Sequence, residues 1–182
     1  MITYEFAFLI GGALLLIFLA IGFIMKIGTR KIIAGCLFIA YLTVVASITL
    51  FPILYDNEVE YWGDVTWYNF IPFRTITNMF SYGFNTTAFI QLAGNICMSI
   101  PYGIFIMMFV DNKKWWKLLL FALLFTVSIE FLQFLIGMIL GNMYRTVDID
   151  DAILNVLGCY IGYIIYKLLP KSIKNFLIKK QA

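Results

Sequence analysis

The chain has 182 residues, of which 63% are apolar and only 13% charged, where an ordinary soluble domain has roughly 25% charged residues. A mean hydropathy of +0.93 leaves too little polar surface for a cytosolic enzyme, a secreted disulfide domain or a disordered chain. The net charge of +3 is too small for a nucleic-acid binder. Because the chain has no histidine, a His-based catalytic triad, a His–Zn site and a haem with an axial His are excluded, and we expect no cofactor.

Five stretches are apolar and long enough to cross a bilayer, which takes about 20 residues of helix. Backbone groups cannot stay unpaired in lipid, and these stretches lack the alternating pattern of barrel strands, so each is predicted to be a helix. The sequence therefore predicts an all-α, polytopic membrane bundle. Its five expected transmembrane helices are Phe6–Met25, Ile32–Tyr55, Ala88–Val110, Trp115–Leu140 and Ala152–Leu169.

The positive charges predict the orientation of these helices. Eleven of the 13 Lys and Arg residues lie within 26–31, 113–117 and 167–180, on one side of the predicted membrane. Arg74 and Arg145 are the two on the other side. Since cytoplasmic loops carry the excess of Lys and Arg, we expect the N-terminus outside and the C-terminus inside.

We expect a single membrane domain over residues 1–182. It consists of an extra N-terminal span (1–31), a core (32–169) and a basic tail (170–182). The first span has no basic n-region, so we interpret it as an anchor and not as a signal peptide. The tail is interpreted either as a helix lying on the anionic inner leaflet or as a solvated basic segment.

A loop of about thirty residues, from Asp56 to Thr86, separates the second and third predicted spans on the outer side. Ile76, Met79 and Phe80 share one helical face, which predicts a short interfacial helix over Thr75–Tyr82. Just before it, Asn69 and Arg74 are candidate binding residues.

Polar side chains also occur inside the predicted spans, where an ionisable group is by default a functional hypothesis. The helical rise of 1.5 Å per residue places all of them in the outer half of the bilayer. Glu130 and Gln133, three residues apart, share one face of the fourth span, and Asp148, Asp151 and Asn155 are spaced to share a face of the fifth. The sequence predicts an outward-facing polar pocket beneath Arg74 and Arg145, built from Glu130, Gln133, Asn95, Asn155, Asp148 and Asp151.

Each candidate also has a purely structural interpretation, which the sequence leaves open. Buried amides can bond between helices, as Asn95 and Asn155 would. Acids favour a helix N-terminus, so Asp148 and Asp151 can be caps. A buried acid such as Glu130 can be neutral and bonded to a neighbour. Arg145 can form a surface ion pair.

Six motifs, in order, resemble those of the VanZ-like family over about Ile32–Lys167. They are Leu50-Phe51-Pro52, Asn69-Phe70-Ile71-Pro72-Phe73, Gly94-Asn95 with Pro101-Tyr102-Gly103, Ser128-Ile129-Glu130-Phe131-Leu132-Gln133, Arg145-Thr146-Val147-Asp148-Ile149-Asp150-Asp151, and Asn155-Val156-Leu157-Gly158. The resemblance implies a multi-pass protein of the plasma membrane of a Gram-positive bacterium, with a role at the cell envelope linked to teicoplanin resistance. The family's motif residues correspond here to Asn69, Pro72, Asn95, Glu130, Gln133, Arg145, Asp148, Asp151 and Asn155.

Three functions are compatible with these observations. The first is binding of an amphiphilic envelope molecule, such as a membrane lipid, a lipid-linked wall precursor or a lipoglycopeptide. In this hypothesis Arg145 and Arg74 hold a phosphate or carboxylate. Glu130, Gln133 and the asparagines then bond the polar head.

The second function is an intramembrane enzyme that modifies a lipid headgroup, with Glu130 as general acid or base. Asp148 and Asp151 are further catalytic candidates. Together with Asp150 they either hold a divalent metal ion or only cap a helix. The third function, a lipid transporter or flippase, ranks last because the polar residues do not continue into the inner half of the membrane.

Overall fold

The computed structural model describes residues 1–53, 68–81, 86–110, 114–141, 145–170, 172 and 174; at positions 87 and 88 it describes only the backbone. Within these residues, five helices are long and apolar enough to cross a membrane, as predicted. They are α1 (Glu5–Ile24), α2 (Thr29–Leu50), α4 (Thr86–Phe109), α5 (Trp115–Leu140) and α6 (Ile149–Leu168).

The ends of these helices have local causes. α2 stops at Leu50, five residues earlier than predicted, because Phe51 is extended (φ −112°, ψ 156°) ahead of Pro52. The residue before a proline is pushed out of the helical region. α6 ends at Leu168 for the same reason, since Leu169 precedes Pro170 and has ψ 139°.

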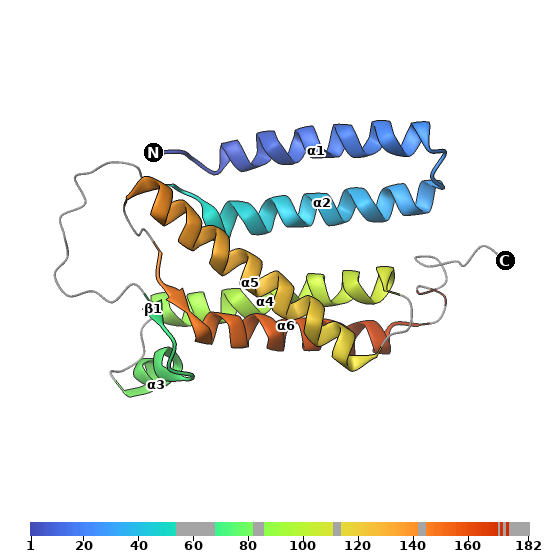
Figure 1. Ribbon diagram of the computed structural model, residues 1–182. Coiled ribbons are helices and arrows are strands. Elements are labelled where there is room, and N and C mark those ends of the chain that lie inside the picture. The colour runs from blue at the N-terminus through green and yellow to red at the C-terminus, as the bar shows by residue number, and fades with distance from the viewer. Residues whose placement is uncertain are drawn as a thin grey trace. The chain divides into compact units, whose positions relative to one another are not determined.

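The chain forms two compact units, Met1–Asn57 with Pro170–Ala182, and Glu58–Leu169. In the first unit α1 and α2 form an antiparallel hairpin (Figure 1). A Cβ atom on Gly11 would lie 2.1 Å from Thr43 Oγ1, so the glycine allows the two helices to approach closely. Most of α1 is exposed, as expected of a helix that anchors in lipid.

In the second unit α4 and α6 run parallel and pack closely, and α5 runs across them at an angle (Figure 1). A Cβ atom on Gly158 would lie 2.3 Å from Ile96 O, and one on Gly162 would lie 2.1 Å from Ile100 O. The two glycines of α6 therefore pack directly against the backbone of α4, as small residues do in membrane helix pairs.

The segment between α2 and α4 contains a strand and a short helix. β1 (Tyr68–Asn69) pairs in parallel with β2 (Val147–Asp148), which directly precedes α6. α3 (Arg74–Ser81) confirms the predicted short helix, one residue earlier in the chain. The two-residue strands were not predicted. The acidic first part of the predicted outer loop and most of the basic tail lie outside the described residues.

Candidate binding pocket

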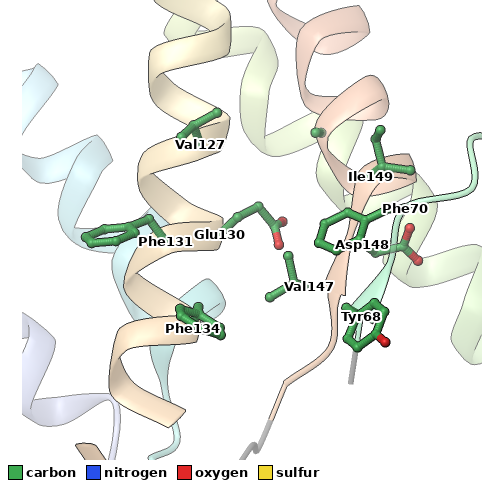
Figure 2. A pocket seen from close by; sticks show the side chains of 10 residues that line it. Tyr68, Phe70, Val127, Glu130, Phe131, Phe134, Val147, Asp148 and Ile149 are labelled. Carbon is green, nitrogen blue, oxygen red and sulfur yellow. The ribbon is translucent and has the colours of Figure 1, made fainter. Parts of the chain in front are cut away.

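A pocket of about 510 Å³ lies in the second unit, between α5 on one side and β1, β2 and the start of α6 on the other (Figure 2). Its described lining residues are aromatic, aliphatic or acidic. They are Tyr68, Phe70, Val127, Glu130, Phe131, Phe134, Val147, Asp148, Ile149 and Ala152.

Glu130 is the polar group that faces this pocket. Figure 2 shows its side chain reaching from α5 toward Val147 and Ile149 on the opposite wall. Its Oε2 atom is buried and accepts no hydrogen bond from any residue that the structure describes. Leaving a buried acceptor unbonded costs about 1–3 kcal/mol, and more for a charged group. The geometry therefore favours a hydrogen-bond donor next to Glu130.

Asp148 lines the same pocket, but its carboxylate points away from Glu130 (Figure 2). Its Oδ1 accepts hydrogen bonds from Asn69 Nδ2 and from the backbone N–H of Asp150, both at 2.9 Å. Its Oδ2 accepts from the hydroxyl of Thr75. Asp148 is thus the N-cap of α6, which agrees with the structural interpretation of this residue.

Asp148, Asp151 and Asn155 were predicted to share one helical face. This prediction is wrong for Asp148. Asp148 has extended backbone (φ −125°, ψ 124°) and lies in β2, before the helix begins. Its side chain therefore accepts hydrogen bonds from Asn69 of β1 and Thr75 of α3, whereas Asp151 and Asn155 accept hydrogen bonds from α4.

Asp150 holds the loop that leads into α3. Its Oδ1 accepts the backbone N–H of Phe73, and its Oδ2 accepts those of Thr75 (2.8 Å) and Ile76 (3.2 Å). Asp150 lies in the first turn of α6 but caps a different helix, α3. Its side chain is completely buried. From the sequence, Asp150 was expected either to hold a metal ion or to cap a helix, and an acid at this position would ordinarily be assigned to its own helix.

Asp151 and Asn155 belong to a line of hydrogen bonds between α6 and its neighbours. Asp151 accepts from Asn95 Nδ2 (2.6 Å) and from Gln91 Nε2 (3.4 Å), both on α4. Asn155 Oδ1 accepts from the hydroxyl of Ser99 at 2.9 Å. Its Nδ2 donates to the Thr126 hydroxyl on α5 at 3.2 Å. The structure therefore gives Asn95 and Asn155 interhelical hydrogen bonds, one of their two predicted roles.

The structure divides the predicted site between the pocket and its surroundings. Glu130 and Asp148 line the pocket. Arg74 is exposed at the start of α3, while Gln133 and Arg145 are half-buried. The predicted residues outside the described lining are Asn69, Arg74, Asn95, Gln133, Arg145, Asp151 and Asn155.

Sequence reasoning missed the aromatic lining of the pocket. Val127, Phe131 and Phe134 stand three residues before, one after and four after Glu130, so helical spacing indicated at least Val127 and Phe134 as neighbours on its face. Tyr68 and Phe70 had no such signal, because they reach the pocket through the pairing of β1 with β2.

The aspartates give little support to a metal site. The oxygens of Asp148 and Asp150 already accept the hydrogen bonds described above, and a metal ion would have to replace them. Among the residues that the structure describes, no group of three Cys, Asp or Glu side chains is placed to hold a metal ion.

A family model matches residues 38–170, from the middle of α2 to the end of α6. The match includes the whole pocket and every predicted site residue. The chain belongs to the VanZ/LLP1 family. With its five long apolar helices, it is a VanZ-like membrane protein, and α1 lies outside the family region. No match was found among curated proteins or among solved structures.

Proposed function

We propose that this VanZ-like protein binds an amphiphilic molecule of the bacterial cell envelope in the Glu130 pocket, and that this binding contributes to teicoplanin resistance. The proposed partner is a membrane lipid, a lipid-linked wall precursor or the lipoglycopeptide itself. The proposed location is the plasma membrane of a Gram-positive bacterium. The orientation that places the pocket toward the outer leaflet remains a prediction from the Lys and Arg distribution.

The observation that carries this proposal is a mostly apolar pocket in which a buried carboxyl oxygen accepts no hydrogen bond from the described residues. This carboxyl group belongs to a helix long enough to span the membrane. Ligand sites are typically apolar concavities with a few polar groups that fix orientation. The aromatic and aliphatic walls suit a hydrocarbon chain, and Glu130 suits a polar head. Tyr68 and Phe131 are 60% and 58% exposed, which leaves the pocket accessible from outside the unit.

The two arginines have a separate place in this proposal. Arg74 begins α3 and Arg145 lies just before β2, in the segments that adjoin the pocket walls. We propose that they hold an acidic part of the ligand outside the pocket itself. Replacing Arg145 by Ala is then expected to weaken resistance.

The test fills the pocket and measures teicoplanin resistance in cells that produce the protein. Ala152→Trp places a large side chain in the pocket wall, and Glu130→Gln removes the acid while keeping the shape. Ala20→Trp, on the exposed side of α1, is the matched control. At equal membrane abundance, we expect both pocket variants to lose resistance and the control to keep it. Full resistance in both pocket variants would overturn the proposal.

One observation also favours a second function, an enzyme that acts on a lipid headgroup. A carboxyl group shielded from solvent and facing a pocket is a suitable general acid or base, and Glu130 meets that description. Asp148 is a weaker catalytic candidate because its oxygens already cap α6 and bond Asn69 and Thr75. Mass spectra of lipids from cells with wild-type protein and with Glu130→Gln test whether the protein modifies a lipid headgroup. An altered headgroup only with wild type supports catalysis, and identical lipids contradict it.

A further inference from the structure

The chemistry of the pocket also indicates which kind of head group it selects. We propose that the Glu130 pocket binds the ammonium group of an amine-bearing amphiphile, with the hydrocarbon chain of that molecule along the aromatic and aliphatic walls and any acidic part outside the pocket. This inference rests on the proposed function and narrows it to one class of ligand.

The walls around Glu130 suit a positive charge. Four aromatic rings line the pocket, two from the β1 segment (Tyr68 and Phe70) and two from α5 (Phe131 and Phe134). The faces of aromatic rings attract ammonium groups, and the attraction grows when the site is shielded from water. An N–H of the ammonium group would also supply the donor that Glu130 Oε2 does not receive from the described residues.

The same walls disfavour an anion. The described lining residues include two acids and neither Lys nor Arg. Close by, at the start of α6, the carboxylates of Asp150 and Asp151 accept the hydrogen bonds described above from neutral backbone and amide groups. A phosphate or carboxylate head in this pocket would therefore meet negative charge without a described cation on the pocket wall, and like charges repel strongly in a low dielectric.

A neutral hydroxyl is the remaining competitor, because it can also donate to Glu130. It would gain the hydrogen bond but not the attraction of the rings and the carboxylate for a full charge. An amine and an alcohol of equal chain length therefore separate the ammonium proposal from simple amphiphile binding.

The experiment measures thermal unfolding of the purified full chain in dodecyl maltoside micelles with octylammonium, octanol or octanoate added. For wild type, we expect octylammonium at about ten times its Kd to raise Tm by roughly 3 °C more than octanol, since a ligand that binds only the folded state stabilises it. Octanoate is expected to give no specific shift. Glu130→Gln should lose the octylammonium shift, and Phe131→Leu should reduce it.

Glu5→Gln, which neutralises an exposed acid at the start of α1, is the control and should respond as wild type does. The Tm of each variant without ligand shows whether it is folded. Equal shifts for octylammonium and octanol that disappear in Ala152→Trp would overturn the ammonium proposal and leave the proposed function standing. Shifts that do not depend on Glu130, Phe131 or Ala152 would overturn both.

Discussion

Replacing Asp150 by Ala tests whether this buried carboxylate holds the pocket wall in place. The loop after β1 carries Phe70 into the pocket and continues into α3. The backbone N–H groups of Phe73, Thr75 and Ile76 donate hydrogen bonds to the carboxylate of Asp150 in α6. Without the carboxylate, we expect the loop and the start of α3 to detach from α6.

The size of the effect follows from the contacts. A hydrogen bond to a charged group contributes about 1.5–3 kcal/mol, and the loss of a helix N-cap costs about 0.5–2 kcal/mol. Asp150 is 0% exposed, so water does not replace it easily. Phe73 has φ 65°, a left-handed conformation that costs a non-glycine residue about 1–2 kcal/mol and that opening would relieve. Because three bonds share two oxygens, we expect a total of about 3–4 kcal/mol, or at least a hundredfold easier opening.

Amide hydrogen exchange in lipid nanodiscs measures this opening directly. Protection of the amides of Thr75 and Ile76 should fall at least a hundredfold in Asp150→Ala, and roughly tenfold in Asp150→Asn, which keeps one acceptor oxygen. Asp151→Asn is the matched control, since the hydrogen bonds described for Asp151 go to α4 and not to this loop. Unchanged protection in Asp150→Ala would show that the loop is held by other contacts.

Two further pairs of substitutions test the packing of the second unit. Gly158→Ala should destabilise the fold by about 1–3 kcal/mol in thermal unfolding, because its Cβ would lie 2.3 Å from Ile96 O, whereas Gly94→Ala, with open space around it, should be neutral. Asn155→Leu should lower the free energy of unfolding by about 1–2 kcal/mol, because it removes both interhelical hydrogen bonds of Asn155. Thr126→Val should lower it by less, since it leaves the bond to Ser99 intact. Equal stability of Asn155→Leu and wild type would contradict this expectation.

Length and hydropathy were enough to predict the five long helices. The fourth agrees to the residue, Trp115–Leu140, because charged residues precede it and Gly141 ends it with a left-handed conformation (φ 67°). The second was predicted too long because hydropathy alone does not register the effect of Pro52. Orientation in the membrane is a separate prediction, based on the distribution of Lys and Arg.

The candidate site was predictable only in part, because composition says which helices carry polar groups but not how each helix is rotated. Asn95 and Asp151, both predicted in the outer half of the membrane, are bonded to each other. Glu130 and Gln133 share a face by spacing, yet only Glu130 lines the pocket. A strand of two residues has no periodicity to detect, so the position of Asp148 in β2 could not be foreseen.

The division of the polar residues between the pocket and its surroundings has a consequence for ligand choice. Several motif residues form hydrogen bonds that fix where the pocket walls stand. Asn69 and Asp148 join β1, β2 and the start of α6, whereas Asn95, Asp151 and Asn155 join α6 to its neighbouring helices. The groups that would touch a ligand are mainly hydrocarbon, with Glu130 as the acid among them. The side chain of Phe131, one of the wall residues, is 58% exposed, so substituting it disturbs little of the packed interior. Substitutions in the pocket walls can therefore change which ligand the pocket prefers, while the hydrogen-bonded framework and the fold stay the same.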